Sequence, residues 1–123
     1  MQSLLPSFVV CCVLTSCGMK CEDTKKVEVA SPSGKHKVIV FERDCGATTP
    51  ISTIVALVPA DSTFDGEKSS RLFVIRGPAH IKVSWKSNKE ALVQYPAGLE
   101  EDIFTKEAAS EGIAIVYEGI VGH

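Results

Sequence analysis

This 123-residue sequence has no large excess of one charge, no glycine-rich phosphate loop and no metal-ligand pattern. Thirteen Lys and Arg residues stand against 15 Asp and Glu, so charge gives no reason to expect a nucleic-acid partner. The glycines are isolated in turns and do not form a phosphate-binding loop. The three histidines and five cysteines lack the spacing of zinc ligands. We therefore predict no cofactor, no metal and no nucleic acid.

Charge is also missing from the first part of the chain, where no Lys, Arg, Asp or Glu precedes Lys20. Residues 4–14 form an apolar run that is interrupted only by Pro6 and Ser7. As a helix this run would extend about 17 Å, which is too short for a hydrocarbon core about 30 Å thick. Its length is typical of the apolar region of a signal peptide. We therefore predict a signal peptide over residues 1–16.

The predicted signal peptide ends in Leu14-Thr15-Ser16-Cys17, which resembles the lipobox of bacterial lipoproteins. In that family a diacylglycerol is attached to the cysteine thiol and the signal is cut just before it. The resemblance implies a lipid on Cys17 and a tether over residues 17–24. Acyl chains would hold the protein at a membrane, because each buried CH₂ contributes about 0.8 kcal/mol. Gly18 after the cysteine implies, in a Gram-negative host, the outer membrane and the periplasmic side.

Two other interpretations of the N-terminal stretch remain open. One is a cleaved secretory signal without a lipid. The other is a buried N-terminal strand over residues 7–14, in which Cys17 is an ordinary thiol.

The number of cysteines supports export. Removal of the signal would discard Cys11 and Cys12, and lipidation would consume Cys17, which leaves Cys21 and Cys45. An oxidising envelope compartment would pair these two cysteines. The disulfide would close a loop of about 25 residues and contribute about 3 kcal/mol.

From Lys25 onward the sequence alternates between polar and apolar residues. The segment Ser31-Pro32-Ser33-Gly34 has turn chemistry, because Pro presets φ and Gly accepts a positive φ. Strands are expected over residues 26–30, 37–42, 51–58, 71–76 and 113–118. We predict one all-β domain over residues 25–123, formed by a mostly antiparallel sheet or a small sandwich of hairpins.

The first hairpin pattern recurs later in the chain. Residues 27–35 align with residues 81–89, apolar on apolar, and Asn88 stands where the first hairpin has Gly34. Asn is the next-best residue for a positive φ. We interpret the repeat as a recurring meander within one sheet or sandwich, with chance similarity as the alternative.

Two segments are harder to assign. The polar residues 60–70 are expected to form the most mobile loop. The apolar spacing near residues 99–109 fits one short helix, whereas residues 103–106 also fit a strand that pairs with the C-terminal strand. We favour the strand, because its expected partner is clearly β.

The densest polar cluster is Glu42-Arg43-Asp44-Cys45-Gly46-Ala47-Thr48-Thr49-Pro50. With the preceding Ser-Pro-x-Gly-Lys hairpin it resembles a family of small exported bacterial proteins to which no activity is assigned. The resemblance spans residues 29–59, and it implies a fold and no catalytic residues. Read physically, the cluster is a turn whose side chains satisfy backbone amides. The functional interpretation is a binding patch, formed by Arg43, Asp44, Thr48 and Thr49, for a partner protein or an envelope glycan.

Two functions follow from these observations. The first is a lipid-anchored envelope protein that acts as a non-catalytic binding or accessory module, with the membrane and an envelope protein as partners. The second is a thiol-dependent or hydrolytic envelope enzyme, in which Cys45 would be the nucleophile and His36 its base. The sequence shows no complete catalytic constellation, so we favour the first function.

Overall fold

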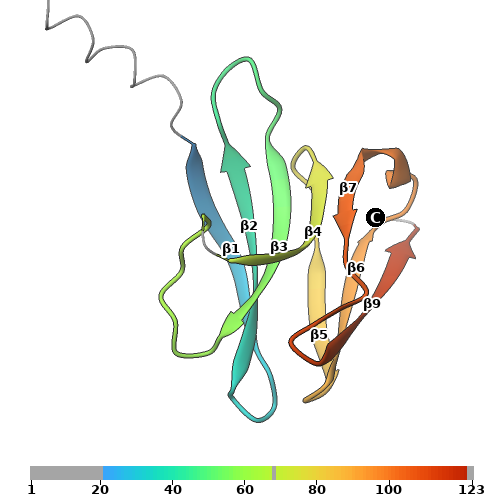
Figure 1. Ribbon diagram of the computed structural model, residues 1–123. Helices are drawn as coiled ribbons and strands as arrows, with labels where there is room; N and C mark the ends of the chain where they lie inside the picture. The colour runs from blue at the N-terminus through green and yellow to red at the C-terminus, as the bar shows by residue number, and fades with distance from the viewer. Residues whose placement is uncertain (1–20, 68, 122–123) are drawn as a thin grey trace, which may run out of the picture.

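A computed structural model describes residues 21–67 and 69–121 and shows two facing β-sheets (Figure 1). The five-stranded sheet has the order β1-β2-β3-β4-β7, and the four-stranded sheet has the order β5-β6-β9-β8. The strands are β1 (Glu22–Ala30), β2 (His36–Asp44), β3 (Ser52–Pro59), β4 (Ser70–Arg76), β5 (Lys82–Ser87), β6 (Glu90–Pro96), β7 (Ile103–Lys106), β8 (Ala109–Ser110) and β9 (Ile113–Ile120). All neighbouring strands are antiparallel except β6 and β9, which are parallel. The predicted all-β fold is confirmed.

The main core lies between the two sheets. Alternate residues of β2 and β3, together with Leu72, Phe73 and Ile75 of β4, face it from the five-stranded sheet, and residues of β5, β6 and β9 face it from the other. Its buried residues include Val38, Val40, Val55, Leu57, Leu72, Phe73, Ile75, Val93, Tyr95 and Ile115. The Phe73 ring packs against both Tyr95 and Tyr117, at centroid distances of 5.6 and 5.5 Å.

A second, smaller core covers the outer face of the five-stranded sheet. It contains Ile39, Phe41, Ile54 and Ala56, which alternate with the residues of the main core. Phe64, from the loop after β3, packs edge-on against Phe41 at 5.1 Å between ring centroids. Residues 60–67, which we call the covering loop, therefore lie over this face (Figure 1). Because β2 and β3 are covered on both faces, their central residues are consecutively apolar and do not alternate with polar ones.

The two hairpins recognised as a repeat stand in opposite sheets and touch. The backbone N–H of Ser33 donates to Oδ1 of Asn88 at 2.7 Å, and Nε1 of Trp85 donates to the Val29 carbonyl at 3.1 Å. Gly34 has the predicted positive φ of 77°. Asn88 does not take a positive φ. A two-residue turn joins β5 to β6, where five residues join β1 to β2.

The strand predicted over residues 103–106 is present as β7, after a single 3₁₀ turn, η3 (Glu100–Asp102). The prediction that this strand pairs with the C-terminal strand, β9, is wrong. β7 pairs with β4, at the edge of the five-stranded sheet. The antiparallel partner of β9 is the two-residue strand β8. Ile103 packs against the main core from that edge, and β9 is already paired with β6 on its other side.

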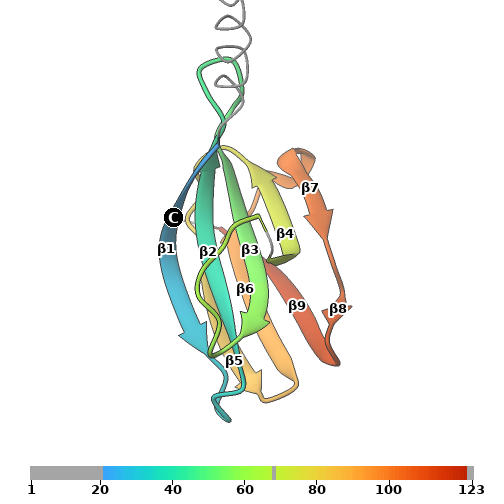
Figure 2. The ribbon, with the colours of Figure 1, turned by 60° about the vertical axis from the view of Figure 1, so that its left-hand side comes forward.

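The N-terminal end of β1 lies beside the connection between β2 and β3, which extends beyond the sheets (Figure 2). β1 already begins at Glu22, so residues 22–24, which we expected in a tether, belong to the sheet. The predicted signal peptide (residues 1–16) and the predicted lipidation site, Cys17, lie outside the described residues. No helix in the described part of the chain is long and apolar enough to cross a membrane.

Candidate functional site

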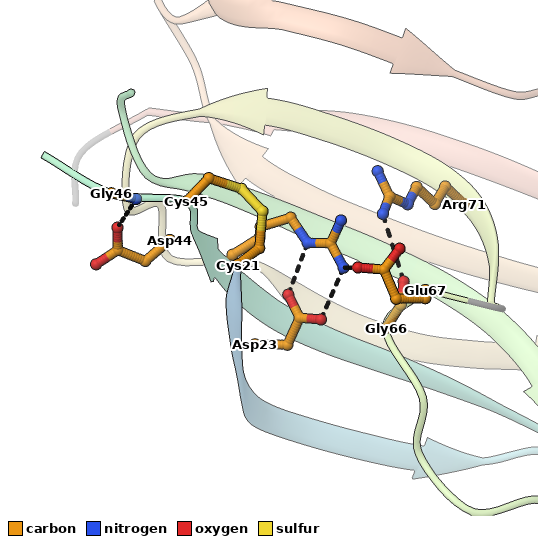
Figure 3. Close-up of a disulfide and its surroundings, with 9 residues drawn as sticks. Cys21, Asp23, Asp44, Cys45, Gly46, Gly66, Glu67 and Arg71 are labelled. Atoms are coloured by element: carbon orange, nitrogen blue, oxygen red, sulfur yellow. Dashed lines mark hydrogen bonds and ion pairs between the residues drawn. A yellow bond between two sulfur atoms is a disulfide. The ribbon is translucent and has the colours of Figure 1, made fainter. Parts of the chain in front are cut away.

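Cys21 and Cys45 form the predicted disulfide, at the end of the sandwich where β1 begins and β2 ends (Figure 3). The register of the two strands explains the pairing. Glu22 of β1 lies opposite Asp44 of β2, so the residue before β1 and the residue after β2 continue the same antiparallel register. The disulfide therefore closes the open end of the β1–β2 ladder.

Arg43 is held by two carboxylates beside the disulfide. Its Nε and Nη2 donate to the two carboxylate oxygens of Asp23 at 2.7 and 2.8 Å, and Nη2 also donates to Oε2 of Glu67 at 2.9 Å (Figure 3). The side chains of Arg43 and Asp23 are each 14% exposed, whereas Glu67 is 69% exposed. The hydrogen bonds that the Arg43 guanidinium donates to the Asp23 carboxylate raise the pKa of Arg43 above its ordinary value. Arg43 thus joins β1, β2 and the covering loop.

Asp44 is the exposed last residue of β2, and Thr48 and Thr49 belong to the exposed connection that follows it. Oδ1 of Asp44 accepts a hydrogen bond from the Gly46 N–H at 3.0 Å, and the Thr49 N–H donates to the Gly46 carbonyl at 3.2 Å. Gly46 has a φ of 119°, a backbone conformation that would be strained in a residue with a side chain. The Asp44 side chain thus satisfies a backbone amide, as expected for a turn. Thr48 and Thr49 are both exposed.

The four residues of the predicted binding patch therefore divide into two groups. Asp44, Thr48 and Thr49 are exposed at the end of β2 and in the connection after it, whereas the guanidinium of Arg43 donates to Asp23 on the neighbouring strand.

The geometry separates the two residues of the proposed thiol mechanism. His36 begins β2 and Cys45 follows its last residue, so about 30 Å of extended chain lies between them. The sulfur of Cys45 is also bonded to Cys21. Within residues 21–67 and 69–121, no three His, Cys, Asp or Glu side chains gather where they could hold a metal ion.

Sequence reasoning missed the carboxylates of Asp23 and Glu67. Asp23 had a usable signal, since pairing Cys21 with Cys45 in an antiparallel ladder places residue 23 opposite residue 43. Glu67 had none, because the path of the covering loop depends on Phe64 packing against the sheet.

No family model, curated protein or solved structure matches this chain.

Proposed function

We propose that this chain is an exported, lipid-anchored envelope protein whose β-sandwich is a non-catalytic binding module. The observation that carries the proposal is the disulfide between Cys21 and Cys45. Structural disulfides form and persist in oxidising compartments outside the cytoplasm. The uncharged apolar stretch before Lys20 and the lipobox at Cys17 supply the route to such a compartment and the anchor.

The position of the disulfide suits an anchor at Cys17. Four residues of fully extended chain from Cys17 to Cys21 span at most about 14 Å, so the sandwich would lie close to the lipid head groups. The disulfide would pass any pull on the anchor directly into β1 and β2, because it joins the ends of both strands. The connection Gly46-Ala47-Thr48-Thr49-Pro50, at this same end, carries no charge that anionic head groups would repel.

The exposed connection is the binding surface of the proposal. Asp44, Thr48 and Thr49 offer a carboxylate and two hydroxyls for hydrogen bonds to an envelope protein. In a Gram-negative host this surface would face the periplasm at the outer membrane, near the anchor.

Substitution of the proposed anchor tests this function. We expect Cys17→Ser, expressed in a host with lipoprotein processing, to accumulate as an uncleaved, unacylated precursor. Cys12→Ser, a matched change inside the predicted signal peptide, should still be cleaved and should partition into the detergent phase. If Cys17→Ser is processed like the unchanged protein, the lipid-anchor proposal is wrong.

A further inference from the structure

An irregularity in β1 places two neighbouring side chains on one side of the strand. Lys25 pairs with Phe41 and Val27 pairs with Val40, so Lys26 has no partner in the ladder and forms a β-bulge. Val40 belongs to the main core, and Phe41 belongs to the outer face. The bulge thus lets Lys26 and Val27 both line the space between the sheets, and Lys25 lies opposite an outer-face residue.

A carboxylate stands on the same inner face. Along β2 the inward residues Val38 and Val40 are buried and apolar, and the next inward residue is Glu42. Its Oε1 lies 3.7 Å from Nζ of Lys26. This separation is longer than a hydrogen bond, so the two opposite charges attract each other and keep capacity for further partners. Glu42 is 25% exposed and Lys26 is 47% exposed, so a ligand can reach both.

The opposite wall of this space is held in place by one buried hydroxyl. Oγ1 of Thr53 donates to the Gly77 carbonyl at 2.8 Å and accepts from the Ala79 N–H at 3.0 Å. Thr53 is 1% exposed and lies opposite Glu42 in the β2–β3 register. It fixes the segment that crosses from β4 to β5, which supplies Pro78, Ala79, His80 and Ile81 to the cleft.

The resulting cleft has a volume of about 370 Å³. Small-molecule sites in proteins have volumes of about 300–1,000 Å³ and combine apolar walls with a few convergent polar groups. Here the walls are formed by Val27, Val40, Ala79 and Ile81, and the charges are those of Lys26 and Glu42.

We propose that this cleft binds a free apolar α-amino acid, whose ammonium pairs with Glu42 and whose carboxylate pairs with Lys26. An α-amino acid carries its two opposite charges on one carbon, which matches a Lys–Glu pair 3.7 Å apart. Its apolar side chain would displace water from the aliphatic walls. A ligand of one charge sign would instead engage one member of the ion pair and repel the other. This site is independent of the lipid anchor.

Titration calorimetry of the full chain in detergent, with three related probes, tests the ligand class. L-leucine carries both charges, 4-methylpentanoate lacks the ammonium, and 3-methylbutylamine lacks the carboxylate. We expect leucine to bind at least about tenfold more tightly than either analogue, because each analogue loses a charge-assisted hydrogen bond. Equal binding of the three probes, or the absence of binding by leucine up to its solubility, would overturn the proposal.

Matched variants test the site. Glu42→Gln and Lys26→Met should each weaken leucine binding about tenfold or more and remove the preference over the analogues. Lys25→Met, the same change one residue away at a position opposite Phe41, should leave leucine affinity unchanged. Fluorescence of Trp85, the single tryptophan, establishes that each variant is folded. The Cys17→Ser protein should bind leucine as the unchanged chain does, so loss of the anchor and loss of the ligand site give different results.

Discussion

Asp23 of β1 and Arg43 of β2 lie opposite each other and form a two-bond ion pair, at 2.7 and 2.8 Å, directly inside the Cys21–Cys45 disulfide. Because both side chains are 14% exposed, water replaces this contact poorly when it is broken. The ion pair and the disulfide therefore join the same ends of β1 and β2. Glu67, which accepts a hydrogen bond from Arg43, connects the covering loop to the ion pair.

Removal of the Arg43 guanidinium should destabilise the fold. We expect Arg43→Met to lower the free energy of unfolding by about 2 kcal/mol, since it leaves the Asp23 carboxylate without its partner. Arg43→Lys should restore little, because an ammonium cannot form the parallel pair of bonds. Urea unfolding followed by tryptophan fluorescence measures both. Lys25→Met, which breaks only the exposed pair with Glu28, should cost less than about 0.5 kcal/mol. If Arg43→Met and Lys25→Met lower the free energy of unfolding equally, the Asp23–Arg43 ion pair does not stabilise the fold.

Gly66 in the covering loop is predicted to tolerate no side chain. A methyl group added there would collide with the Asp23 carboxylate and come within 3.1 Å of the Phe41 ring. We expect Gly66→Ala to destabilise the protein by about 1–3 kcal/mol, through displacement of the loop or of the ion pair. Thr63→Ala, an exposed position in the same loop, should change stability by less than about 0.5 kcal/mol. Equal thermal midpoints for the two variants would contradict the close packing of this loop.

Tyr117 should make stability fall at alkaline pH. Its hydroxyl lies 3.0 Å from the Leu72 carbonyl and 2.8 Å from the Glu107 carbonyl, and it has one proton to donate. Burial, together with the negative charge of Glu107, raises the pKa of Tyr117 well above its ordinary value. The unfolded chain therefore loses this proton first, near pH 10, and stability decreases as the pH rises beyond that point.

The measurement is a comparison of unfolding free energies for the unchanged protein and Tyr117→Phe across the alkaline range. At neutral pH the variant should be less stable by about 1 kcal/mol, because one hydrogen bond is lost. Above about pH 10 the difference should shrink, since the variant has no such proton to lose. Parallel curves would show that Tyr117 does not couple to folding.

The disulfide should contribute to stability only when it is formed. We expect Cys45→Ala to lower the unfolding free energy by about 3 kcal/mol under oxidising conditions, because the chain between the two cysteines gains conformational freedom in the unfolded state. In excess reductant the variant and the unchanged protein should have similar thermal midpoints. An equal loss in reductant would mean that Cys45 acts through packing.

The sequence predicts strands better than it predicts their partners. The strand over residues 103–106 is predicted because its expected partner is clearly β, and the structure has it as β7, with Ile103 packed on the core and Phe104 exposed. A period of two carries no information on which sheet edge receives the strand. β7 pairs with Phe73, Val74 and Ile75 of β4, a pairing between distant parts of the chain that the local sequence pattern does not predict.

The candidate site divides in the same way. Cysteine parity predicts the Cys21–Cys45 bridge, and the bridge in turn implies the Asp23–Arg43 register. The bulge at Lys26 could not be predicted, because consecutive lysines in an edge strand read as solvated residues and a bulge is visible only in the pairing with β2. The cleft also needs Thr53 to hold a segment from another part of the chain.

Intact mass spectrometry of the protein purified from membranes without reductant tests the central claim most directly. We predict a chain that starts at Cys17, carries the added mass of acyl chains and shows the mass deficit of one disulfide. A soluble chain that retains Met1, carries no lipid and has free thiols at Cys21 and Cys45 would contradict it.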